Sequence, residues 1–129
     1  MRAPPVLTLS FMVALILTAG CSNNTGPIAG ALTVSLSSPH GDDGAVLLTV
    51  VGGPVDSVES TGYPLYSARS GGDTLKLIVT GNLGSGAIAR VRIPDSRQAS
   101  RYSARLAQAA ARGTYAPHDP AAYTLTLLP

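Results

Sequence analysis

The stretch that decides the fold is residues 74–93, which read TLKLIVTGNLGSGAIARVRI. Apolar residues take every second position on both sides of a glycine-rich centre: Leu75, Leu77 and Val79, then Ala87, Ala89, Val91 and Ile93. This period of two predicts strands with one buried face, with Arg90 and Arg92 on the outer face. Residues 81–86 lack the spacing of a phosphate-binding loop and are typical of a hairpin connection. The stretch therefore predicts an antiparallel β-hairpin.

Strand patterns also fill the chain before this hairpin. Residues 31–36 alternate, with Leu32, Val34 and Leu36 on one face. Residues 45–51 are a continuous apolar run between glycines, which predicts a strand buried on both faces. Residues 55–59 favour a short strand, and Pro64 restricts the next apolar segment to a sheet edge.

The chain after the hairpin leaves one choice open. Residues 96–112 fit a helix by composition, yet Tyr102, Ala104 and Leu106 alternate as in a strand. We favour a short helical turn near residues 96–99 followed by a strand. Residues 122–128 alternate strongly and need a partner, and pairing with residues 102–110 would close a sheet.

Composition and strand spacing together indicate the fold class. The chain has 129 residues, one Phe and no Trp, so a single domain with an aliphatic core is expected over residues 30–129. Short strands separated by frequent turns predict an all-β protein, a small antiparallel β-sandwich. The apolar strand at residues 44–51, the glycine-rich connection and VRIPD at residues 91–95 resemble the immunoglobulin-like and cohesin-like modules of bacterial surfaces. The Cys-Trp-Cys spacing of true immunoglobulin domains is absent.

The N-terminus has the features of an export signal. Arg2 precedes an apolar run at residues 6–17, which is shorter than the ~20 residues that cross a bilayer. The LTAGC of residues 17–21 resembles the lipobox of bacterial lipoproteins, although Thr18 replaces the usual leucine. This resemblance implies that residues 1–20 are a signal peptide, cut before Cys21, and that diacylglycerol is attached to the Cys21 thiol. The alternative is an ordinary signal peptide cut nearby, with Cys21 a free thiol.

The residues after Cys21 are expected to link the lipid to the domain. Residues 21–29 are small and polar and include Gly26-Pro27, which favours a flexible tether. In the lipoprotein family an aspartate after the cysteine often marks retention in the inner membrane, so Ser22 favours the outer membrane. The expected location is therefore outside the cytoplasm, anchored by lipid to the outer membrane or cell surface.

Motifs for catalysis and metal binding are scarce. The single cysteine excludes a disulfide framework and a cysteine-based zinc site, and neither G-x-S-x-G nor H-E-x-x-H occurs. The HGDDG of residues 40–44 offers Asp42 and Asp43 as calcium ligands but lacks the spacing of an EF-hand loop. We interpret it as a solvated turn, and residues 118–120 as a turn capped by Asp119. No enzyme activity, cofactor or metal is predicted.

Charge suggests one candidate binding site. Removal of residues 1–20 lowers the formal net charge from +2 to +1, which argues against general nucleic-acid binding. Arg97, Arg101 and Arg105 recur every fourth residue, so they would share a face in either a strand or a helix. Guanidinium groups suit phosphate and carboxylate groups, so this patch is a candidate anion-binding site. Alternatively, arginines coat the outer strand faces and discourage edge-to-edge association.

Three functions follow from these observations. The expected one is a lipid-anchored protein of the cell envelope that acts as a structural or protein-interaction module. The first alternative is an envelope lipoprotein that binds an anionic polymer or lipid through Arg97, Arg101 and Arg105. The second is an anchored enzyme, for which no motif argues.

Overall fold

The computed structural model describes residues 26–129, so the predicted signal peptide and Cys21 lie outside the described residues. The strands are β1 (Gly30–Ser37), β2 (Asp43–Val51), β3 (Ser57–Ser60), β4 (Leu65–Arg69), β5 (Leu75–Leu83), β6 (Gly86–Ile93), β7 (Ser103–Ala111), β8 (Pro117–His118) and β9 (Thr124–Leu128). Two 3-10 helices, η2 (Ser96–Arg101) and η3 (Pro120–Ala122), connect some of them. Within residues 26–129, no helix is long and apolar enough to cross a membrane.

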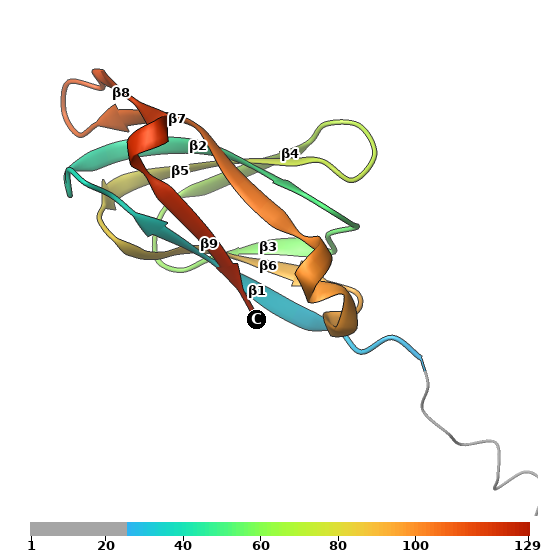
Figure 1. The fold of residues 1–129 in the computed structure, drawn as a ribbon. Helices are drawn as coiled ribbons and strands as arrows, with labels where there is room; N and C mark the ends of the chain where they lie inside the picture. The colour runs from blue at the N-terminus through green and yellow to red at the C-terminus, as the bar shows by residue number, and fades with distance from the viewer. Residues whose placement is uncertain (1–25) are drawn as a thin grey trace, which may run out of the picture.

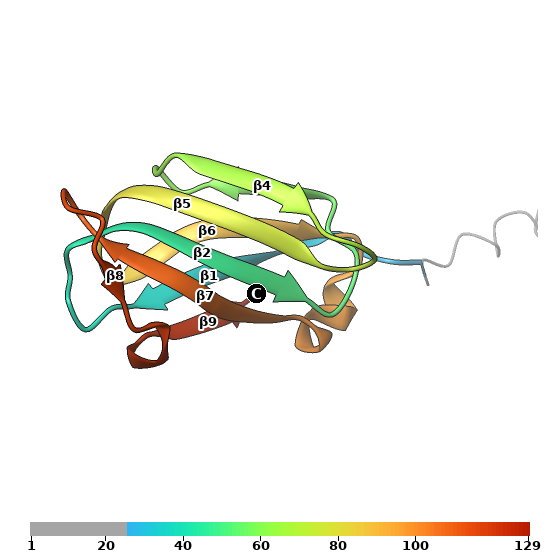
Figure 2. The same cartoon turned by 90° about the horizontal axis from the view of Figure 1, so that it is seen from above.

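The strands form two antiparallel sheets that pack face to face (Figures 1 and 2). The four-stranded sheet has the order β3-β6-β1-β9, and the five-stranded sheet has the order β4-β5-β2-β7-β8. The predicted all-β sandwich is therefore confirmed. Pro64 lies directly before β4, which is an edge strand as the proline required.

The core between the sheets is aliphatic. Leu32, Val34 and Leu36 of β1 face inward, opposite Leu75, Leu77 and Val79 of β5, and each is at most 3% exposed. Their alternation was predicted from the sequence and is confirmed. Tyr102 and Tyr123, both 8% exposed, are the aromatic members of this core.

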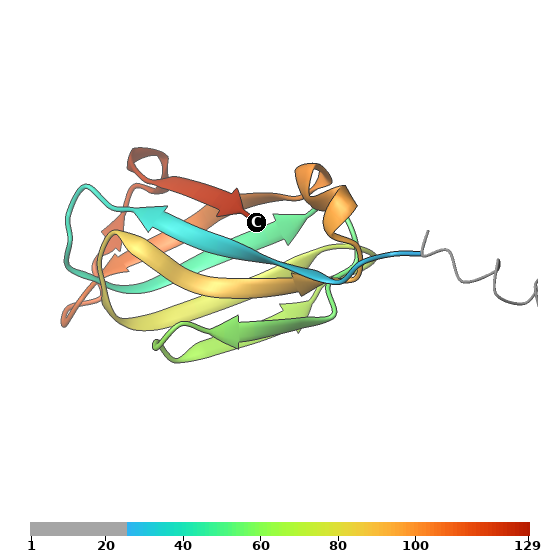
Figure 3. The same ribbon diagram turned by 90° about the horizontal axis from the view of Figure 1, so that it is seen from below.

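The predicted hairpin at residues 81–86 is wrong, because β5 and β6 belong to different sheets (Figure 3). The register of β5 against β2 shifts between Asp43–Leu83 and Ala45–Thr80. Leu83 keeps the inward facing of the odd-numbered residues Leu75, Leu77 and Val79 and is 1% exposed. The chain then crosses from one sheet to the other through Gly84 and Ser85.

The predicted pairing of residues 102–110 with residues 122–128 is also wrong. The helical turn and the strand after it are confirmed as η2 and β7, but β7 pairs with β2 and β8. The last strand, β9, pairs with β1 in the opposite sheet. Each 3-10 helix lies where the chain passes from one sheet to the other. The crossing at η3 places β9 in a different sheet from β7.

Two predictions of which side chains point into the core are also wrong. Residues 45–51 are buried on one face only, since Val46, Leu48 and Val50 are at most 1% exposed while Val51 is 40% exposed. In β6 the register shift opposite Val34 and Ser35 inserts Ile88 as an extra residue. Ile88 is therefore buried and Ala87 is exposed, the reverse of strict alternation.

Candidate functional site

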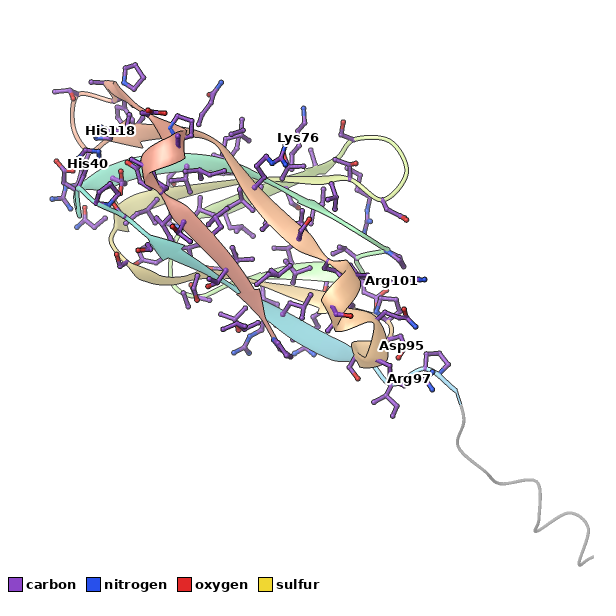
Figure 4. The ribbon with its side chains drawn as sticks, viewed as in Figure 1. His40, Lys76, Asp95, Arg97, Arg101 and His118 are labelled. Atoms are coloured by element: carbon purple, nitrogen blue, oxygen red, sulfur yellow. The ribbon has the colours of Figure 1, made fainter. Side chains whose placement is uncertain are left out.

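The densest group of chemically active side chains lies where the β1–β2 turn meets β8 and the start of β9. We call it the loop-end cluster, and its members are His40, Asp42, Asp43, His118 and Tyr123. In Figure 4, His40 and His118 lie together at one end of the sandwich, and Asp95 and Arg97 lie at the other. The turn and β8 are adjacent because β2 and β8 both flank β7.

Asp43 is the buried centre of the loop-end cluster, with 0% of its surface exposed. Its Oδ2 accepts a 2.5 Å hydrogen bond from the Ser38 hydroxyl, and its Oδ1 accepts one from the Tyr123 hydroxyl. The solvated turn expected for residues 40–44 is therefore wrong for Asp43, although Asp42 beside it is exposed. Within residues 26–129 the ion pairs are Arg92–Glu59 and Arg97–Asp95, so neither involves Asp43.

The two hydroxyl donors are themselves fixed. Ser38 Oγ accepts backbone hydrogen bonds from His40 and Gly41, at 3.2 Å and 3.1 Å, which organises the turn around this hydroxyl. Burial raises the pKa of the Tyr123 hydroxyl, and its hydrogen bond to Asp43 raises it further. Tyr123 therefore stays protonated and donates to the carboxylate.

The two histidines of the loop-end cluster lie against each other and beside Tyr123. The rings of His40 and His118 stack with their centroids 3.9 Å apart and an interplanar angle of 15°. His118 Nε2 is buried and has no hydrogen-bond partner among residues 26–129. One ligating atom each from Asp42, Asp43 and His118 lies within 4.8 Å of the other two. Asp119 accepts a hydrogen bond from the Ala121 amide at 3.0 Å, which confirms its predicted capping role.

An apolar groove begins beside His118 and runs over the outer face of the five-stranded sheet. Its volume is about 600 Å³, and its lining includes Leu47, Ile78, Tyr115 and His118. Strand register places Tyr66 and Leu47 on either side of Ile78, in one row across the sheet. Tyr66 is 64% exposed, Ile78 42% and Tyr115 61%. We call Leu47, Tyr66, Ile78 and Tyr115 the apolar face.

Basic residues border the apolar face on the side away from the loop-end cluster. Thr49, two residues along β2 from Leu47, pairs with Lys76 of β5 and with Arg105 of β7. Paired residues share a face, so Lys76 and Arg105 point outward from the same sheet surface. Both side chains are exposed. The groove therefore has an apolar centre and a positively charged rim.

The three predicted anion-binding arginines do not lie on one element. Arg97 and Arg101 belong to η2 and Arg105 to β7, so the expectation that one strand or helix carries all three is wrong. Arg97 forms hydrogen bonds of 3.0 Å and 3.1 Å to the two carboxylate oxygens of Asp95. These bonds lower the pKa of Asp95, whose carboxylate also caps η2. Figure 4 places Arg97 and Arg101 at the end of the sandwich nearest residue 26.

The loop-end cluster was missed as a site because its parts are distant in sequence. The polar residues at positions 40–44 and at positions 118–120 were each interpreted as a separate turn. Tyr123 lies 80 positions from Asp43, and no local pattern joins them. Comparison with protein-family models, curated proteins and solved structures found no match.

Proposed function

We propose that this protein is a lipid-anchored module of the cell envelope that binds a protein partner through the outer face of its five-stranded sheet. The observation that carries the proposal is the row of Tyr66, Ile78 and Leu47 across β4, β5 and β2, in which Tyr66 and Ile78 are exposed and Leu47 is half-buried. In an antiparallel sandwich the outer faces are ordinarily polar, and a contiguous apolar patch marks an interaction surface.

The chemistry of this surface specifies the kind of partner. Aromatic side chains such as Tyr66 and Tyr115 supply large contact areas that dominate binding energies. Lys76 and Arg105 at the rim favour acidic groups opposite them. The partner is therefore a protein that presents an apolar centre with carboxylates around it.

A lipid anchor at Cys21 would leave this surface accessible to a partner. The chain enters β1 at the end of the sandwich that carries η2, where the Ser96 amide donates to the Ile28 carbonyl, whereas β8 lies at the opposite end (Figure 1). A lipid on Cys21 would hold the η2 end toward the membrane and leave the loop-end cluster and groove facing away. The outer sheet face would then be accessible to an envelope protein.

Photo-crosslinking in envelope preparations tests the proposed surface. A photoreactive amino acid at Ile78 is expected to give one discrete protein adduct, and the same adduct is expected from position 66. The matched control is Arg90, which is exposed on the outer face of the other sheet. Leu47→Glu is expected to abolish the adduct at Ile78. Equal adducts from positions 78 and 90, or none from 78, would contradict the proposal.

A second candidate function is binding of anionic lipid or envelope polymer by Arg97, Arg101 and Arg105. The position of Arg97 and Arg101 at the end nearest residue 26 favours it, because an anchored protein would turn this end toward the headgroups. The triple change to Gln is expected to weaken binding of residues 26–129 to anionic vesicles at low salt. Equal binding by variant and parent would contradict this second candidate function.

A further inference from the structure

Asp43 presents an unusual electrostatic arrangement. A carboxylate that is 0% exposed is ordinarily neutralised by a cation, since burial removes the hydration of its charge. Here it receives two hydroxyl hydrogen bonds, from Ser38 and Tyr123, and no basic side chain of the described residues forms an ion pair with it. Each carboxylate oxygen carries two lone pairs, so both retain a free acceptor position.

His118 presents the complementary problem of a polar atom without a partner. Its Nε2 is buried and makes no hydrogen bond to any described residue, although buried polar atoms nearly always find a partner. A neutral imidazole offers one nitrogen lone pair and is the commonest metal ligand in proteins. An imidazole nitrogen of His118 lies within 4.8 Å of a carboxylate oxygen of both Asp42 and Asp43.

We propose that Asp42, Asp43 and His118 bind one divalent transition-metal ion, with Zn²⁺ as the best-fitting probe. Zinc accepts imidazole nitrogen and carboxylate oxygen at about 2.0–2.2 Å, so two of its ligands lie about 3–4 Å apart. The three ligating atoms lie within 4.8 Å of one another, so small side-chain movements in the loop-end cluster would bring them into this range. A nitrogen ligand disfavours Ca²⁺, which prefers a shell of oxygens.

The surroundings suit such an ion. Hydrogen bonds from Ser38 and Tyr123 fix the orientation of Asp43, as they commonly do for carboxylates that ligate metals. The bound ion would join the β1–β2 turn to β8 and so fix His118, which lines the apolar groove. His40 is not assigned as a ligand. Its ring is stacked on that of His118, and one ion cannot lie in the planes of two stacked rings.

Zinc titration of the purified full-length chain, stripped with EDTA, tests this site. We expect binding of one equivalent by calorimetry and a rise in the unfolding midpoint that EDTA reverses. Co²⁺ is expected to give the absorption spectrum of an ion with nitrogen and oxygen ligands. Ca²⁺ at the same concentration should not raise the midpoint. Absence of saturable zinc binding would overturn the proposal.

Variants identify the ligands. His118→Gln and Asp42→Asn are each expected to weaken zinc binding at least about tenfold. His40→Gln, a histidine of the same loop end, and Asp73→Asn, an exposed carboxylate on the β4–β5 turn, should change it less than about twofold. Asp43→Asn should also weaken binding, and if it fails to fold, the variants at the exposed Asp42 and the half-buried His118 decide. Unchanged affinity in His118→Gln, or equal loss in His40→Gln, would overturn the assigned ligands.

Discussion

At the scale of single residues, Gly52 shows how close contact and backbone conformation combine. Its φ is +122°, and a Cβ added there would lie 2.1 Å from the carbonyl oxygen of Arg101. Gly62 has the same φ of +122°, but a Cβ at that position would meet nothing within 4 Å. The two glycines therefore separate the effect of the conformation from the effect of the contact.

We expect Gly52→Ala to destabilise the fold more than Gly62→Ala. Both variants force a side chain into a conformation that costs about 1–3 kcal/mol, but only Gly52→Ala also displaces the backbone at Arg101. Free energies of unfolding from urea titrations measure the difference. Equal destabilisation would mean that the backbone at Arg101 moves away from the added Cβ without a measurable loss of stability.

The pKa shifts of two core tyrosines predict how stability depends on pH. Burial raises the pKa of Tyr102, whose hydroxyl donates to the Pro54 carbonyl at 2.6 Å, and burial also raises that of Tyr123. The folded state therefore holds protons that the unfolded state releases near pH 10. Their contribution to stability is complete below about pH 10 and is lost as the pH rises further.

The expected result is a free energy of unfolding that falls steadily above about pH 10. Tyr102→Phe and Tyr123→Phe should each reduce this slope, because each removes one of the shifted groups. Urea titrations at a series of alkaline pH values provide the measurement. An identical slope in both variants and the parent would show that other groups cause the alkaline loss.

Alternation in the sequence predicted the facing of most core residues, but it did not predict Asp43 or Ile88. Leu75, Leu77 and Val79 follow strict period two, and so their burial is readable from the local pattern. Ile88 is buried by a register shift that depends on its partner strand. Asp43 is buried where it accepts hydrogen bonds from two hydroxyl groups, one of them 80 positions away. Neither cause is encoded in the neighbouring residues.

At the scale of elements, strand pairing can be tested by engineered disulfides. Ser35 and Thr126 are register partners in β1 and β9, whereas Arg105 lies on the outer face of the other sheet. Adjacent antiparallel Cα atoms are about 4.5–5.5 Å apart, within the range that a disulfide spans. In a Cys21→Ser background, Ser35→Cys with Thr126→Cys should oxidise readily, and Arg105→Cys with Thr126→Cys should not. Oxidation of the second pair would instead support pairing of β7 with β9.

The elements themselves were predicted more accurately than their partners. The segments that became β1, β5, β7 and β9 were all expected as strands, and a helical turn was expected where η2 lies. Alternation reveals which face of a strand is buried. It does not reveal the sheet to which the strand belongs, because both sheets of a sandwich bury their inner faces in the same core. The choice of sheet is made at Gly84-Ser85, η2 and η3, where the chain crosses between layers. Glycine-rich connections serve hairpins and such crossings equally well.

At the scale of the whole molecule, the two ends of the sandwich carry different chemistry. The end nearest residue 26 carries Arg97 and Arg101, and the other end carries His40 and His118 (Figure 4). A tether of residues 21–29 reaches at most about 30 Å when fully extended. A lipid at Cys21 would therefore keep the arginine end within about this distance of the membrane, and the proposed metal site lies at the end farther from the point of attachment.

This arrangement depends on acylation of Cys21, which metabolic labelling can test. Expressed in a bacterial host, the full chain is expected to incorporate radioactive palmitate and to partition into detergent, since two or more acyl chains anchor stably. Cys21→Ser should abolish both results, because Cys21 is the only cysteine in the chain. Ser22→Ala serves as the matched control and should keep the label, since it leaves the thiol in place. Labelling of the Cys21→Ser protein would refute the lipobox interpretation, and with it the membrane-facing orientation of Arg97 and Arg101.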